Sequence, residues 1–196
     1  MNALLGYSEL MKRELTDPKL LDYQEKMEQS GNLLLSIINN VLDMARIESG
    51  KMELDENYVK IRDIYYGVYK IFQAEAEKKG IPLEMEYDVR HEHVICDETK
   101  NRGIFLNLIS NAVKYTDVNG VINIGIVNDW LYIENTYGNN KISNMDKIFD
   151  VKFDLNKENS NGLGLYIVSN ILNNYNMEYK ALQDEEFFIF KIKIFS

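Results

Sequence analysis

The segment Arg102–Thr116, RGIFLNLISNAVKYT, constrains the fold more than any other stretch of this sequence. Its spacing predicts a helix, because apolar residues recur every four positions and form two adjacent stripes. Asn107, Asn111 and Lys114 recur at helical spacing as well and share a separate face. The apolar stripes require burial in a core, whereas the polar face needs either water or a ligand. Spacing alone leaves both interpretations of that face open.

The residue types on the polar face suggest what a ligand would be. An asparagine side-chain oxygen suits a hard cation such as Mg²⁺, and a lysine ammonium suits phosphate. The segment Asn107–Thr116 resembles the N box of bacterial sensor histidine kinases. That family shares an ATPase superfamily with DNA gyrase and the Hsp90 chaperones. The resemblance implies a nucleotide site with ATP and Mg²⁺ as its ligands.

Composition narrows the function classes. A chain of 196 residues can form one large domain, or one domain with a helical appendage. The formal charge of −9 argues against a nucleic-acid-binding surface, although a nucleotide site needs only a few local donors. The single cysteine, Cys96, excludes an intrachain disulfide and fits a reducing compartment. No apolar run approaches the length that spans a bilayer.

Residues 1–50 are predicted to form a helical hairpin. Residues 1–15 have a broad apolar face, and Asp17 and Pro18 predict the start of a second helix over 19–48. A hairpin with two wide apolar faces cannot bury them alone, so we expect a homodimer in which two hairpins form a four-helix bundle. Packing against the chain's own C-terminal domain is the alternative. The second helix has a heptad repeat with Leu20, Met27, Leu34 and Val41 at one core position, and Tyr23, Ser30, Ile37 and Met44 at the other.

The resemblance extends to this hairpin. Residues 1–11, MNALLGYSELM, are similar to the segment after the phosphoacceptor histidine of the kinases, and residues 42–54 to the end of the second dimerisation helix. The phosphoacceptor would therefore lie upstream of Met1, so this chain alone is not expected to autophosphorylate. His91 and His93 match no phosphoacceptor motif and are expected in a solvent-facing turn.

Residues 51–196 alternate between helix and strand patterns. Their order predicts an α+β sandwich of one mostly antiparallel sheet and one helical layer, and the resemblance implies an ATP-binding domain of the Bergerat type. The predicted strands span 52–61, 83–87, 93–96, 121–127, 130–134, 179–182 and 187–195, and the predicted helices span 62–79, 102–116 and 161–175.

A second motif opens the last predicted helix. Residues 160–165 read SNGLGL, and glycines at a helix start let backbone N–H groups approach a phosphate. A glycine pair is weak by itself, but it follows the N-box match in the family's order, after a KIFD segment at 147–150 that is similar to the F box. The resemblance implies nucleotide contacts from Ser160, Gly162, Leu163, Gly164 and Leu165.

Two stretches depart from the family pattern. In ENTYGN, residues 134–139, Asn135 occupies the position of the adenine-reading aspartate, and Tyr137 and Asn139 replace two glycines. A neutral amide binds the adenine amine more weakly than a carboxylate does, and tyrosine does not freely adopt positive φ. The predicted lid, 151–160, is short and contains no arginine. We therefore expect modest nucleotide affinity, about tens of micromolar or weaker.

The resemblance implies a role for each polar residue. Asn111 would hold Mg²⁺, Asn107 would contact a metal-bound water or phosphate, and Lys114 would neutralise phosphate. Tyr115 would lie along the nucleotide, and Asn135 would read adenine. Catalysis would consist of positioning and charge stabilisation during phosphoryl transfer.

The sequence therefore predicts the ATP-binding core of a sensor histidine kinase, a transferase whose partner is a response regulator. Its location would be cytoplasmic, with any membrane anchor in other segments. The alternative is a non-catalytic dimerisation and signalling module with weak or no nucleotide binding. A serine kinase like the anti-sigma factors, on the same ATPase fold, is disfavoured by the predicted dimerisation hairpin.

Overall fold

The computed structural model describes residues 6–7, 10–11, 15–50, 54–89, 92–127, 129–139, 141–150 and 163–194. The chain divides into two compact units, Met1–Met52 and Glu53–Ser196. Of the helix predicted over 1–15, the described residues 6–7 and 10–11 are helical, and Leu15 is not. Among the described residues, no helix is both long enough and apolar enough to cross a bilayer.

The first unit contains one long helix, α2 (Pro18–Glu48). The predicted start is confirmed, because the Asp17 carboxylate accepts a hydrogen bond of 2.8 Å from the Lys19 N–H. The heptad residues Leu20, Met27, Leu34 and Val41 are 46%, 56%, 47% and 52% exposed. A regular row of half-exposed apolar side chains on a helix is what a coiled-coil or bundle partner covers.

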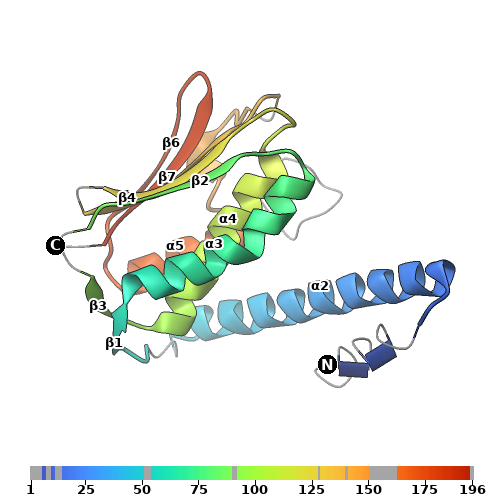
Figure 1. Ribbon diagram of the computed structural model, residues 1–196. Coiled ribbons are helices and arrows are strands. Elements are labelled where there is room, and N and C mark those ends of the chain that lie inside the picture. Colours follow the sequence, from blue (N-terminus) through green and yellow to red (C-terminus); the bar gives the residue numbers. More distant parts are fainter. Residues whose placement is uncertain are drawn as a thin grey trace. The chain divides into compact units, whose positions relative to one another are not determined.

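The second unit alternates helices and strands, broadly as predicted. Figure 1 shows the helices of this unit lying on one face of a curved sheet. The elements are β1 (Asn57–Lys60), α3 (Ile61–Lys78), β2 (Leu83–Tyr87), β3 (His93–Cys96), α4 (Glu98–Tyr115), β4 (Ile122–Val127), β5 (Trp130–Thr136), the 3₁₀ turn η1 (Met145–Lys147), α5 (Gly164–Asn174), β6 (Tyr179–Gln183) and β7 (Phe187–Lys193).

The main sheet has the strand order β2-β4-β5-β7-β6. The β2 and β4 strands are parallel, and the other neighbours are antiparallel, so the prediction of a mostly antiparallel sheet is confirmed. Along β5 the buried residues alternate with half-buried ones. The buried row faces the helices, because a strand presents successive side chains to opposite faces.

The prediction of a single sheet is wrong for β1 and β3. These two strands pair with each other, antiparallel, in a separate ladder. The first strand begins at Asn57 and not at residue 52 as predicted. Before it, the Asp55 N–H donates to the Asp97 carboxylate at 3.1 Å, so a side chain holds this segment where a strand partner would otherwise be needed.

The core is centred on α4, which packs against α3 and α5 and lies on β5. The two predicted apolar stripes are buried, and the Tyr65 and Phe105 rings meet edge to face with centroids 3.8 Å apart. Burial of this much apolar surface supplies most of the stability of the domain. The buried stripe residues are Ile104, Phe105, Leu108, Ile109, Ala112 and Val113.

Candidate nucleotide site

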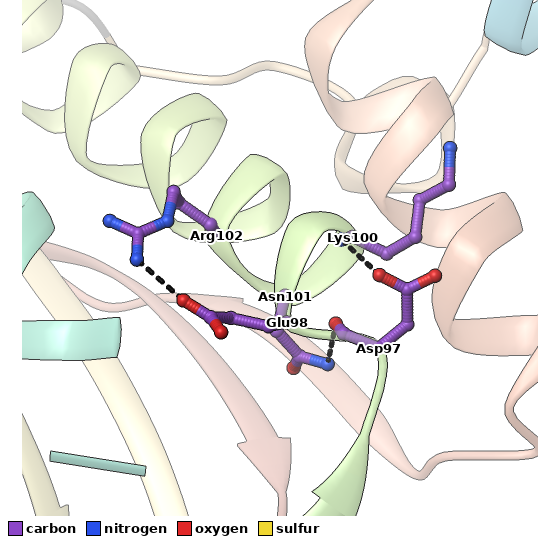
Figure 2. Close-up of polar contacts among 5 residues, drawn as sticks. All are labelled: Asp97, Glu98, Lys100, Asn101 and Arg102. Carbon is purple, nitrogen blue, oxygen red and sulfur yellow. Dashed lines mark hydrogen bonds and ion pairs between the residues drawn. The ribbon is translucent and has the colours of Figure 1, made fainter. Parts of the chain in front are cut away.

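The helix that carries the polar face begins at a well-satisfied cap. Asp97 is the N-cap, and its carboxylate accepts from the Lys100 N–H at 2.9 Å. The Asn101 side chain donates to the Asp97 carbonyl at 3.0 Å, and Arg102 forms a 2.8 Å ion pair with Glu98 (Figure 2). A capped first turn fixes where the helix starts, and hence which way its polar face points.

The polar face of α4 meets the start of α5. A Cβ atom added at Gly164 would lie 3.1 Å from Asn107 Oδ1 and 3.7 Å from Asn111 Nδ2. The Asn107 amide nitrogen donates to the Gly103 carbonyl at 3.0 Å, so its oxygen is left on the side of Gly164. The structure thus brings three of the predicted site residues together from segments more than 50 residues apart in sequence.

Gly164 also opens α5, three residues later than the predicted helix start. The residue before it, Leu163, is the N-cap and has no side-chain group that could satisfy the first N–H groups. Unsatisfied N–H groups at a helix start form an anion site, since the helix dipole adds to them. Leu165 is half-buried in the first turn, whereas Ser160, Gly162 and the whole predicted lid lie outside the described residues.

Lys114 and Tyr115 end the helix, one turn beyond Asn111. The Lys114 ammonium lies 4.9 Å from the centre of the Tyr115 ring, a cation–π distance. Both side chains are half-buried. They occupy the C-terminal end of α4, as predicted.

Asn135 lies on the sheet, near the end of β5. It is 4% exposed and stands in the buried row of β5, where its two predecessors are Leu131 and Ile133. Its amide nitrogen donates to the Thr136 carbonyl at 3.0 Å, which leaves its oxygen as an acceptor. A polar residue at the end of an otherwise apolar row is the pattern expected of a ligand-binding position.

Tyr137 was expected to hinder the turn after β5, and the structure shows that it does not need positive φ. Positive φ falls on Gly138, at 49°, and not on Tyr137. The Tyr137 ring is buried, and its hydroxyl lies 2.8 Å from the Asp184 carbonyl and 3.0 Å from that of Glu185, in the turn between β6 and β7. The tyrosine therefore anchors the loop to the neighbouring hairpin, and the turn it was expected to hinder is made one residue later.

Asp117 belongs to the same loop region and was missed by the sequence reasoning. Its carboxylate accepts from the Asn139 N–H at 3.3 Å and packs so closely on Gly138 that a Cβ there would overlap it. The carboxylate ties the end of α4 to the loop after β5. A single aspartate 22 residues from its partner carries no local signal that could have revealed this contact.

The described residues offer no group of three His, Cys, Asp or Glu side chains that could hold a metal. A cation at this site would depend on amide oxygens and on the ligand's own phosphates.

His93 is exposed on β3 and stacks on Tyr58 with ring centres 4.8 Å apart, whereas His91 lies outside the described residues. Burial raises the pKa of the Cys96 thiol to about 11, so this group stays protonated and unreactive.

Comparison with known families settles the relationship. Residues 96–194, half of the chain, match the family described as "Histidine kinase-, DNA gyrase B-, and HSP90-like ATPase". Residues 1–50 match the "His Kinase A (phospho-acceptor) domain". The chain belongs to the sensor histidine kinases. Residues 96–194 are the ATP-binding domain of this family, and they include α4 and α5.

Curated relatives agree with this assignment. The Non-motile and phage-resistance protein of Caulobacter vibrioides is 32% identical over 128 residues, which are 63% of this chain and 15% of that protein. Histidine kinase 3 of Arabidopsis thaliana is 36% identical over 118 residues, which are 60% of this chain and 11% of that protein. The chain thus spans a small part of the length of the relatives it matches.

Solved histidine kinase structures have the same fold. Full-length ShkA in complex with AMPPNP superimposes with a TM-score of 0.72 at 23% identity, over 100% of this chain and 43% of that one. AdeS of Acinetobacter baumannii gives 0.70 at 18% identity, over 98% and 93%. ThkA in complex with the response regulator protein TrrA gives 0.62 at 23% identity, over 98% and 57%.

Proposed function

We propose that this chain is the nucleotide-binding core of a protein that uses Mg²⁺-ATP to phosphorylate a histidine and then transfers the phosphoryl group to a response-regulator aspartate. The observation that carries the proposal is the meeting of Asn107 and Asn111 with Gly164. An amide oxygen from Asn107, an amide N–H from Asn111 and an open helix start are complementary to a metal-bound phosphate chain.

Each residue contributes binding or orientation. Asn107 directs its side-chain oxygen toward the start of α5, and Asn111 lies beside the same glycine. Lys114 supplies positive charge, Tyr115 offers a ring beside the nucleotide, and Asn135 accepts from the adenine amine. Backbone N–H groups of Gly162 to Leu165 hold the phosphates. The protein therefore acts chiefly by holding ATP in place and balancing its charge.

Asn111 is the residue we assign to the metal, with Asn107 close enough to act through a water. When bound, Mg²⁺ neutralises charge on the phosphates. The fit rests on two neighbouring amides with no carboxylate cluster among the described residues, and Mg²⁺ commonly keeps several waters and takes its other ligands from phosphate. Such a site would bind the ion together with ATP and only weakly alone.

The acceptor histidine is proposed to lie outside these 196 residues, because neither His91 nor His93 falls within the matched phosphoacceptor domain.

The exposed apolar row on α2 favours a homodimer through residues 1–50. The ThkA complex with TrrA favours a response-regulator receiver domain as the second partner. The cytoplasmic segment of QseC, which shares the fold, favours a cytoplasmic location.

A second candidate function is a signalling module that dimerises but does not bind nucleotide. Asn135 favours it, since the family's aspartate would hold the adenine amine more strongly. The two candidates differ in one measurable quantity, the affinity of this chain for Mg²⁺-ATP.

Calorimetric titration of Mg²⁺-ATP into the chain and into Asn111→Ala tests the proposal. We expect binding at about tens of micromolar for the parent chain and at least about 30-fold weaker binding for the variant, as expected for loss of a metal ligand. Gly103→Ala is a suitable control, because a Cβ at Gly103 would meet nothing within 4 Å. No binding by the parent chain would refute the kinase proposal, and unchanged binding by Asn111→Ala would refute the metal assignment.

A labelling experiment tests the position of the acceptor. Incubation of this chain alone with γ-labelled ATP is expected to leave no acid-labile phosphate on the protein. Label on His91 or His93, located by mass spectrometry, would show that the acceptor has been misplaced.

A further inference from the structure

The helices α4 and α5 run antiparallel and touch at both ends. At one end, Gly164 lies against Asn107 and Asn111. At the other end, the Tyr175 hydroxyl accepts a hydrogen bond of 3.0 Å from the backbone N–H of Asp97. Asp97 is the N-cap of α4 and Tyr175 is the C-cap of α5, so this bond joins the outer termini of the two helices.

Asp97 is 6% exposed, and its polar atoms are all used. Its N–H donates to Tyr175, and its two carboxylate oxygens accept from Lys100 and Asp55 at 2.9 and 3.1 Å. Its carbonyl accepts from the backbone and side chain of Asn101, both at 3.0 Å. Figure 2 shows the carboxylate and carbonyl contacts to Lys100 and Asn101 around this cap. One buried residue thus joins the end of β3, the segment before β1 and both helices.

The Tyr175 hydroxyl is suited to this place. Burial raises its pKa to about 12, so the phenol stays protonated and accepts through an oxygen lone pair. Without the hydroxyl, the Asp97 N–H would be left buried without a partner, at a cost of about 1–3 kcal/mol. Moving the Tyr175 hydroxyl away from the Asp97 N–H would therefore cost free energy.

The geometry makes this bond relevant to the nucleotide site. Asn107 lies ten residues beyond Asp97, and Gly164 lies eleven residues before Tyr175, so each helix is about 15 Å long between the bond and the site. The two helical segments between the bond and the site are therefore nearly equal in length. A shift of one helix along the other at the Tyr175 end is transmitted to Gly164, because helices are stiff and their interface is close-packed.

We propose that Tyr175 and Asp97 form a positioning clasp that sets the register of α4 against α5 and thereby aligns the two halves of the phosphate site. The inference rests on the proposed nucleotide binding and names residues that do not touch the ligand. The clasp joins the two helices that carry the phosphate half, whereas Asn135 lies on β5, so we expect the clasp to act on phosphate binding more than on adenine recognition.

The test compares Tyr175→Phe with Tyr69→Phe in the full chain. Tyr69 is a matched control, because its hydroxyl also bonds a backbone group, the Leu83 carbonyl at 3.4 Å, but joins α3 to β2. Calorimetry measures the affinity for Mg²⁺-ATP, and chemical-shift titration measures the weaker affinity for adenosine. Thermal unfolding measures the stability of each variant.

We expect Tyr175→Phe to weaken Mg²⁺-ATP binding about fivefold, the equivalent of one hydrogen bond, with adenosine affinity unchanged. Tyr69→Phe should lose a similar amount of stability and keep its ATP affinity. Tyr175→Phe with a lower Tm but unchanged ATP affinity would overturn the clasp, as would equal weakening of ATP and adenosine. Failure of the parent chain to bind ATP at all would refute the proposed function itself, and the clasp with it.

Discussion

The two halves of the candidate site differ in how the structure builds them. The phosphate half consists of two helices, with Asn107 and Asn111 on α4 facing Gly164 on α5. The adenine half consists of a strand end and a loop, where Asn135 is followed by a tyrosine anchored to the β6–β7 turn. The first half is therefore fixed by the packing of two helices, and the second by a loop that follows a strand.

The two halves should therefore respond differently to substitution. Helices fix several site residues at once, so a change at one position disturbs the others. A loop can place an unusual conformation at a single residue, as Gly138 does with its positive φ beside Tyr137. In the adenine half, the Asp117 carboxylate packs against that same glycine.

Gly164→Ala tests the phosphate half and should have the largest effect. The new methyl group would lie 3.1 Å from Asn107 Oδ1, tighter than an ordinary contact, and would force the amide away. We expect affinity for Mg²⁺-ATP to fall about tenfold, roughly 1.4 kcal/mol, by calorimetry. Stability should hold or rise, because alanine is favoured over glycine within a helix.

Gly103→Ala controls for the change of residue type on α4, since its methyl group would meet nothing within 4 Å. It should leave ATP affinity unchanged. Parent-like binding by Gly164→Ala would mean that the α4–α5 contact is not part of the site.

Gly138→Ala tests the adenine half. Its φ of 49° disfavours any side chain, and the methyl group would overlap the Asp117 carboxylate. We expect a loss of about 1–3 kcal/mol in stability and about three- to fivefold weaker ATP binding, because the loop must rearrange.

Gly80→Ala is the control that distinguishes the effect of backbone strain in general from the effect of strain in the loop after β5. Gly80 also has positive φ, at 69°, but lies at the end of α3 with nothing within 4 Å of its Cβ position. It should lose stability on thermal unfolding without losing ATP affinity. Equal loss of affinity in both variants would show that the loop after β5 has no special part in binding.

Asn135→Asp should have the smallest effect. A carboxylate accepts more strongly from the adenine amine, but it forfeits the amide's bond to the Thr136 carbonyl. We expect a gain of about two- to threefold for ATP, with GTP unchanged, by competition calorimetry.

Asn123→Asp is its control, since Asn123 is an amide on the neighbouring strand whose side chain bonds Glu134 at 2.9 Å. It should change neither nucleotide's affinity. An identical change for ATP and GTP in Asn135→Asp would exclude adenine recognition by this residue.

Sequence reasoning succeeded where the signal is periodic and local. The two apolar stripes of α4, the start of α2 after Asp17 and the strand pattern of β5 each follow from residues within a few positions of one another. It erred on the start of α5 and on the single sheet, because a helix boundary and a strand partner depend on contacts made elsewhere in the chain.

The sequence by itself determined the elements, the polar face of α4 and the family motifs, since side-chain spacing dictates which residues share a face. Only the tertiary structure decided which distant residues meet. Gly164 against Asn107, Asp117 against Gly138 and Tyr175 against Asp97 are each separated by 21 residues or more in the sequence. Such contacts arise from packing of the whole domain, and no local sequence pattern tells which two distant residues will meet.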